Sequence, residues 1–372
     1  MASTNARECL ISAFDGYHYV PVLYARAAET SAIASLPTDA EGQLSPIWVI
    51  PPVATDPKTE EPKKTRSEHV TDVGKSLLKS WGSGPAFVDT HQYVLSEKNR
   101  QGVVSEALET FERLGLKLVP VFRDGMSLQE AAELFDFAFT HNRDICLRLS
   151  GAVWAGIGTP AGDAEFAHLV SLTGAKAKDI HLVIDLQDQV ANPASVSAVA
   201  VRGAMSQLED AEEWRTLTLL GTAMPGTTAE VGRNGTAEIP RSDWMMWKLV
   251  RESRIRKMSF GDYAVQSVDS LSTFNPLYMQ TAAQMRYTIS NAWFVARGTS
   301  TRSGGFKQAH DLAKKITEHA EFSGRDFSSG DEWLANCAVK ASTSGNATTW
   351  RTATTNHHLV MVVRQLANLR GA

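Results

Sequence analysis

Ile180–Leu186 reads IHLVIDL and Ile145–Leu149 reads ICLRL, and these two short stretches decide the fold class. Both are apolar on both faces and rich in β-branched residues, as a parallel strand covered by helices requires. The segment between them is patterned for helices, so we interpret the pair as strands of consecutive βα units.

Six further runs of the same kind lie outward from this pair in both directions. Consecutive runs are separated by roughly 25–40 residues, about the length of one βα unit. Eight such units predict an α/β fold of the (β/α)8, TIM-barrel-like type, although an open doubly wound sheet shows the same rhythm. The six other runs are Tyr19–Tyr24 (YVPVLY), Pro46–Ile50 (PIWVI), Ala86–Val88 (AFV), Leu116–Phe122 (LKLVPVF), Thr216–Leu220 (TLTLL) and Met258–Gly261 (MSFG).

Amphipathic helices are expected between the strands. In Ser127–Phe139, Ser127 followed by Glu130 is a capping box that begins a helix. Three other helices are expected over Gly102–Leu114, after the Asn192-Pro193 pair, and over Asp243–Arg254.

The pattern changes after the eighth strand. Met285–Arg297 predicts a β-hairpin with its turn near Ser290-Asn291, and Thr299–Gly305 predicts a flexible loop. Helices are then expected near Phe306–Ala320, Gly330–Ala338 and Asn356–Leu369. We therefore expect a barrel over residues 1–280 and a C-terminal hairpin with helices over residues 281–372, which caps the barrel and completes the same domain.

The composition of the chain excludes several classes of protein. Its 372 residues are 43% hydrophobic, and 37 basic against 41 acidic residues leave a net charge of −4. This is globular composition without electrostatic attraction for nucleic acids or membranes. Cys9, Cys146 and Cys337 form no disulfide pattern, and neither a signal peptide nor an apolar membrane span is evident, so we expect a cytoplasmic protein.

Familiar catalytic and cofactor motifs are absent from the sequence. Gly74-Lys75-Ser76 matches only the end of a phosphate-binding loop, because His69 stands where the preceding glycine belongs. No local histidine or cysteine spacing indicates a transition-metal site. We accordingly predict no metal and no cofactor.

The position of a residue along the predicted barrel is a better guide to a functional site than these motifs are. Active sites in such barrels lie at the carboxyl ends of the strands. Arg148 and Asp185, each embedded in an apolar strand, must be paired or face a polar lumen. They form either a structural ion pair or part of a site that holds a metal, exchanges protons or binds an anion. The candidates at strand ends are Asp89, Arg123, Arg148, Asp185, Asp262 and Tyr263.

A second set of candidates lies near the C-terminus. Arg286 and Arg297 of the expected hairpin suit either binding of an anion or cross-strand packing, and Arg351 is a further candidate for ligand binding. His357 and His358 point about 100° apart on a helix, so only one of them can face a ligand squarely, as an acid or base.

Several short motifs in matching order resemble the phage "beta protein" family, also met in bacterial genomes as beta family proteins. They are Tyr19–Leu23 (YVPVL), Pro46–Pro52 (PIWVIPP), Phe260–Tyr263 (FGDY), Arg286–Thr288 (RYT), Trp293, Arg297-Gly298, Gly330-Asp331, Trp350-Arg351 and Asn356–His358 (NHH). The resemblance implies a phage or mobile-element setting and a part in phage–host conflict, but no particular reaction.

Two hypotheses follow for function. In the first, the protein is an enzyme or a binder of an anionic small molecule, with Asp185 and Asp262 and one of the two histidines as catalytic groups. In the second, it is a non-catalytic recognition subunit that partners another defence or phage protein.

Three structural expectations test these ideas. Arg148 and Asp185 should lie within ion-pair reach, because they occupy similar heights on adjacent strands. The last helix should fill the eighth-helix position with Asn356 as its N-cap. His357 or His358 should then lie within about one residue length of Asp262 or Arg286.

Overall fold

The computed structural model describes residues 10–190, 193–208, 211–252, 256–268 and 282–371. Asn192, Arg254, Cys9 and the expected boundary between residues 280 and 281 lie outside the described residues. Eight parallel strands close into a barrel, which confirms the predicted fold class. They are β1 (Tyr19–Tyr24), β2 (Ile47–Val49), β3 (Ala86–Asp89), β4 (Leu118–Arg123), β5 (Ile145–Ser150), β6 (Ile180–Asp185), β7 (Thr216–Leu220) and β9 (Ser259–Asp262).

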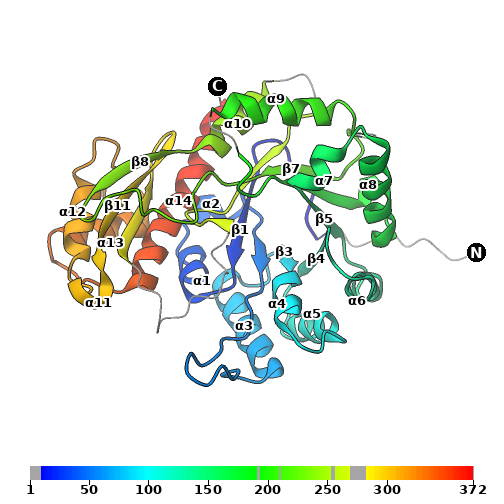
Figure 1. Cartoon of the computed structure of the whole chain (residues 1–372), viewed down its shortest axis with the longest axis horizontal. Coiled ribbons are helices and arrows are strands. Elements are labelled where there is room, and N and C mark those ends of the chain that lie inside the picture. The colour runs from blue at the N-terminus through cyan, green and yellow to red at the C-terminus, as the bar shows by residue number, and fades with distance from the viewer. Residues whose placement is uncertain (1–9, 191–192, 209–210, 253–255, 269–281, 372) are drawn as a thin grey trace, which may run out of the picture.

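Helices surround the barrel strands (Figure 1). Those that precede β9 are α1 (Ala27–Ile33), α2 (Thr38–Glu41), α3 (Arg66–Trp81), α4 (His91–Ser96), α5 (Val103–Arg113), α6 (Leu128–Thr140), α7 (Gly151–Gly156), α8 (Pro160–Thr173), α9 (Ala194–Met205) and α10 (Ser242–Arg251), with a short 3-10 helix over Ala177–Asp179. The helix expected after Asn192-Pro193 begins at Ala194, with Pro193 as its N-cap.

The hairpin unit lies beside the barrel, at the left of Figure 1. Strands β10 (Ala282–Thr288) and β11 (Ala292–Ser300) form the predicted hairpin. The sequence did not indicate their third partner, β8 (Thr236–Pro240), which leaves the barrel after β7 and pairs with β11. A loop of the barrel is therefore part of the hairpin sheet.

The C-terminal helices are α11 (Thr301–Gly304), α12 (Ala309–Thr317), α13 (Ser329–Ala338) and α14 (Ala347–Gly371). The expected loop over Thr299–Gly305 is thus replaced in part by the end of β11 and by α11. Two apolar clusters organise the unit: Met285 and Tyr287 pack with α12 and α13 on one face of the sheet. Trp293 and Val295 pack with loops of the barrel on the other.

Helix α14 occupies the position of the eighth barrel helix and is parallel to α1. Thr352 donates a hydrogen bond to the carbonyl of Ala28, and Asn356 donates one to the carbonyl of Ala32, one turn further along both helices. Because α1 follows β1, the N-terminus of α14 lies at the carboxyl ends of the strands, as expected.

The expected start of this helix was wrong, because α14 begins at Ala347 rather than near Asn356. Asn346 caps it, accepting from the backbone N–H groups of Thr348 and Thr349. The first turns are rich in threonine, which has modest helix propensity, so their helical form depends on packing against α1 and α13. The close contact with α13 requires glycine at Gly330, where a Cβ atom would lie 2.0 Å from the carbonyl oxygen of Ala353.

Residues before β1 close the N-terminal end of the barrel. His18 stacks on Phe14 with 4.2 Å between ring centroids and forms a hydrogen bond with Ser45. Burial lowers the pKa of His18 from 6.5 to about 4. The folded protein therefore favours the neutral ring, whereas the unfolded chain binds a proton below pH 6.5, and stability falls as the pH drops from 6.5 towards 4.

Replacing His18 by glutamine should remove this part of the acid sensitivity. Because of the lowered pKa of His18, the free energy of unfolding of the wild-type protein should be about 2 kcal/mol smaller at pH 5 than at pH 7. Urea unfolding at both pH values, with His168→Gln as an exposed control, measures the difference. Equal losses of stability between pH 7 and pH 5 in the wild type and His18→Gln would contradict this.

Candidate functional site

A charge cluster fills the lumen at the carboxyl ends of the strands. Arg148 donates to Asp185 from Nη2 at 2.7 Å and from Nε at 3.0 Å, so the predicted ion pair is confirmed. It also donates to Asp89 at 2.9 Å and to the hydroxyl of Tyr263 at 2.7 Å. Arg123 reaches Asp89 at 3.3 Å. Five of the predicted site residues thus lie together.

The lumen cluster is buried and balanced in charge. Arg148 is 4% exposed and Asp185 1%. Burial alone would raise the pKa of Asp89, but Arg123 and Arg148 hold it below its ordinary value. Two arginines facing two aspartates leave no net charge in the cluster, and among its described atoms the buried Nε of Arg123 has no partner.

Asp262 does not join this cluster, because successive side chains of a strand point to opposite faces. Tyr263 packs with the lumen residues. Asp262 instead points outward, where its Oδ2 accepts from Nε2 of His358 at 2.8 Å and its Oδ1 from Tyr19 at 2.5 Å. One expected proximity is therefore confirmed: His358 lies beside Asp262.

In His357 and in His358, both ring nitrogens have a hydrogen-bond partner in the protein. His358 is bonded through Nδ1 to the hydroxyl of Thr288, at 2.7 Å. His357 is bonded through Nδ1 to Asp331 and through Nε2 to the carbonyl of Thr288, both at 2.8 Å. Both rings are fully buried. They join α14 to the hairpin and barrel, and we do not include them in the proposed binding site.

Arg286 and Arg351 meet in a pocket of about 130 Å³ at the mouth of the barrel. Val265 and Gln266 of the loop after β9 line it, together with the first turns of α14. No acidic residue is among the described residues that line this pocket. It is a concentration of positive charge at the end of the barrel where (β/α)8 proteins bind ligands.

Burial shapes the electrostatics of the pocket. Arg286 donates through Nη1 to the carbonyl of Val265 at 2.9 Å, and its buried Nε has no partner in the described part of the chain. Burial and the neighbouring Arg351 lower the pKa of Arg286 to about 10, which leaves it cationic at neutral pH. Burial raises the pKa of Glu29, the carboxyl near Arg351, and shifts it towards its neutral form.

Arg297 lies outside this pocket and lines another, of about 360 Å³, with Arg233. Its Nη1 donates to the carbonyls of Ala229 and Val231, at 3.2 and 2.8 Å.

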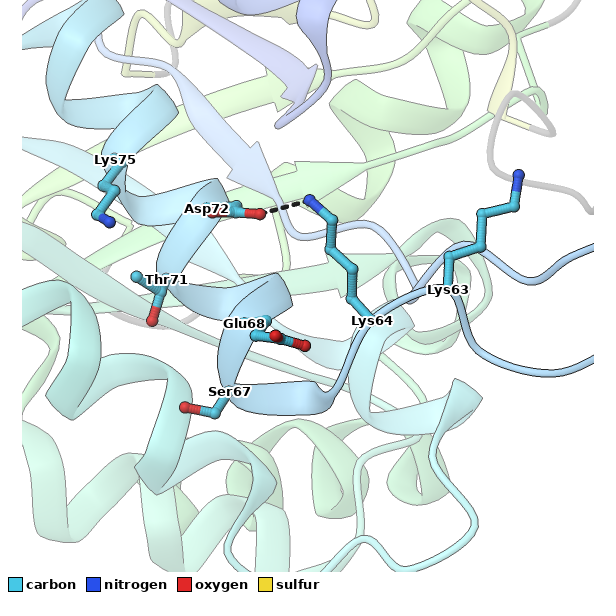
Figure 2. A pocket seen from close by; sticks show the side chains of 7 residues that line it. All are labelled: Lys63, Lys64, Ser67, Glu68, Thr71, Asp72 and Lys75. Carbon is cyan, nitrogen blue, oxygen red and sulfur yellow. Dashed lines mark hydrogen bonds and ion pairs between the residues drawn. The ribbon is translucent and has the colours of Figure 1, made fainter.

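A groove of about 400 Å³ at the start of α3 has a different character. Figure 2 shows Lys63, Lys64 and Lys75 there beside Glu68 and Asp72, with an ion pair between Lys64 and Asp72. Its mixed charges are exposed. Gly74 lies inside α3 against Phe111 and Leu114, so the Gly74-Lys75-Ser76 motif is part of a packed helix.

A family model described as Beta protein matches residues 19–364. The chain belongs to the Beta protein family. Comparison with curated protein sequences gives no match.

Comparison of this Beta protein with solved structures gives several matches, of which three follow, each at low identity and with a low TM-score. The endoglucanase Cel6 from Mycobacterium tuberculosis matches with 16% identity and a TM-score of 0.29, over 45% of this chain and 61% of the endoglucanase. A 2,3-dimethylmalate lyase of the PEP mutase/isocitrate lyase superfamily matches with 12% identity and a TM-score of 0.34. The match covers 68% of this chain and 77% of the lyase. A rubisco-like protein from Burkholderia fungorum matches with 11% identity and a TM-score of 0.33. The match covers 67% of this chain and 55% of the rubisco-like protein.

Two features of the Beta protein bear on metals and membranes. Within the described ranges, no group of three or more histidine, cysteine, aspartate or glutamate side chains is arranged to hold a metal ion. The helices of that part of the chain include none long and apolar enough to cross a bilayer.

The sequence analysis missed several polar residues at the mouth of the Beta protein. Arg26 follows β1, Glu29 lies in the first turn of α1, and His91 follows β3. Nδ1 of His91 lies 3.0 Å from the carboxylate of Glu130, which is why Glu130 does not complete the expected capping box with Ser127. Position after a strand, the signal that found Asp89, would also have found Arg26 and His91.

Proposed function

We propose that this Beta protein binds an anionic group of a small ligand in the pocket between Arg286 and Arg351. The observation that carries the proposal is that two arginines line the pocket and no acidic residue is among its described lining residues. Like charges brought together at the surface of a folded protein are costly, and an anion with several oxygen acceptors relieves that cost.

The geometry suits a phosphate or carboxylate. The guanidinium of Arg286 carries five donors, and it gives a hydrogen bond to the carbonyl of Val265 through Nη1. A cavity of about 130 Å³ holds one compact anionic group rather than a whole drug-sized molecule. The pocket thus takes one end of a ligand.

We propose binding rather than a reaction. The lumen cluster is neutral, and both predicted histidine acids or bases are bonded to protein groups on both nitrogens. This favours the binding form of the first hypothesis, in which the protein binds an anionic small molecule, over its catalytic form. The resemblance to phage beta proteins suggests phage–host conflict in the cytoplasm as its setting.

Replacing Arg351 by glutamine should weaken binding of small anions. Losing one charge-assisted hydrogen-bond partner raises the dissociation constant about 10- to 100-fold. Calorimetric titration with inorganic phosphate and with citrate, at fixed ionic strength, measures it. Lys63→Gln, which removes the same charge from the exposed groove of Figure 2, is the matched control. Equal affinities in Arg351→Gln and wild type contradict the proposal.

The biological setting needs its own test. Bacteria that express the wild type, Arg351→Gln or Lys63→Gln are challenged with a panel of phages, and plating efficiency is counted. We expect the wild type and Lys63→Gln to change plating of at least one phage and Arg351→Gln to lose that effect. Plating that is unaffected by the wild-type protein for every phage argues against a role in phage–host conflict.

A further inference from the structure

One face of the hairpin sheet carries two arginines that belong to different pockets. In the register of the hairpin, Arg286 is opposite Val295 and Gln284 is opposite Arg297. Directly opposed residues share a face, so all four side chains lie on the face that packs towards the barrel loops through Val295. Arg286 and Arg297 are diagonal neighbours there, with Cα atoms about 7–8 Å apart.

The pocket beside Arg297 has the same chemistry as the mouth pocket. Arg233 and Arg297 line it with three hydroxyl-bearing residues, Thr299, Ser300 and Ser303. Its described lining residues again include no carboxylate. Ala282 lines both pockets, so the two cavities share a wall at the start of β10.

The second pocket is held in shape before any ligand arrives. The two hydrogen bonds that Arg297 donates to the carbonyls of Ala229 and Val231 fix its guanidinium against the loop after β7. Gln308 accepts from the backbone N–H of Thr299 at 2.8 Å and donates to the carbonyl of Gly305 at 2.7 Å, which ties α11 to β11. Such preorganisation lowers the entropy lost on binding.

We infer that the two pockets bind two anionic groups of one small ligand, a compact molecule with phosphates or carboxylates spaced along it. The inference rests on the proposed function and extends it: Arg286 and Arg351 hold the first group, and Arg233 and Arg297 hold the second. A second group on the same molecule binds at high effective concentration, so the ligand with two groups binds far more tightly than either group alone.

The test compares probes of one and several anionic groups. Inorganic phosphate, tripolyphosphate and citrate are titrated by calorimetry into the wild type, Arg233→Gln, Arg233→Lys and Lys63→Gln at one ionic strength. In the wild type, tripolyphosphate or citrate should bind about 100-fold more tightly than phosphate. Which of the two does so distinguishes phosphate from carboxylate chemistry.

Arg233 is exposed, so its replacement leaves the fold intact. Arg233→Gln should reduce the advantage of the longer probe over phosphate at least tenfold, whereas phosphate should still bind in the pocket of Arg286 and Arg351. Arg233→Lys should restore part of it, and Lys63→Gln should change neither value. An unchanged advantage in Arg233→Gln overturns the inference and leaves the proposed function standing. Phosphate binding that is insensitive to Arg351→Gln overturns both.

Discussion

Replacing Asp185 by alanine is expected to lower the free energy of unfolding by about 3–5 kcal/mol. The carboxylate is 1% exposed. It accepts from Arg148, from the hydroxyl of Tyr263 at 2.6 Å and from the backbone N–H of Gln187 at 2.9 Å. Its removal leaves two arginines facing one aspartate in a closed lumen, and a buried charge without its partner is strongly destabilising.

Urea unfolding monitored by circular dichroism measures this loss. Asp188→Ala removes an exposed carboxylate three residues further along the same loop and should change stability by no more than about 0.5 kcal/mol. A loss in Asp185→Ala as small as that of the control would show that the lumen cluster contributes little to stability.

Replacing Asp262 by alanine is the second change with a large expected effect, about 3–5 kcal/mol. Three donors depend on this fully buried carboxylate: the hydroxyl of Tyr19, Nε2 of His358 and the backbone N–H of Ala264. Burial lowers the pKa of His358, so its neutral ring donates to Asp262 and accepts from Thr288. Alanine leaves these buried donors unsatisfied at the junction of barrel, hairpin and α14.

A second variant separates the loss of one hydrogen bond from the loss of the whole network. Tyr19→Phe removes one donor and leaves Asp262 with two, so it should cost only about 1 kcal/mol. Thermal and urea unfolding of both variants give the comparison. If Tyr19→Phe costs as much as Asp262→Ala, the tyrosine hydroxyl alone, rather than the set of three donors to the carboxylate, stabilises the junction.

The barrel could be predicted because its signal is strong and local. Each strand is buried on both faces, and runs such as IHLVIDL have few other interpretations at that length. Strand β8 gave no such signal. Its sequence, TAEIP, is short and half exposed, and it is a strand only because β11 offers it a partner.

The site was predicted less completely, because two of its determinants are not local. Asp262 and Tyr263 are neighbours in sequence, yet the pleat of the strand places Asp262 towards α14 and Tyr263 in the lumen. A shift of the strand register by one residue would exchange these two positions. The pairing of Arg286 with Arg351 depends on the first turns of α14, whose threonine-rich sequence gave no helix signal. Position at strand ends remained the most reliable guide.

The placement of α14 beside α1 has a consequence for the order of events during synthesis. The hydroxyl of Tyr19 is hydrogen-bonded to His358, which is 339 residues away in sequence, and to Asp262, which is 243 residues away. Contacts between such distant segments are slow to form, because a long loop must close before they contribute. On the ribosome the first strand and helix emerge early and must wait, with apolar surface uncovered, until almost all of the described chain has been translated. A chaperone that shields β1 and α1 during this interval should raise the yield of folded protein more than one that acts after release.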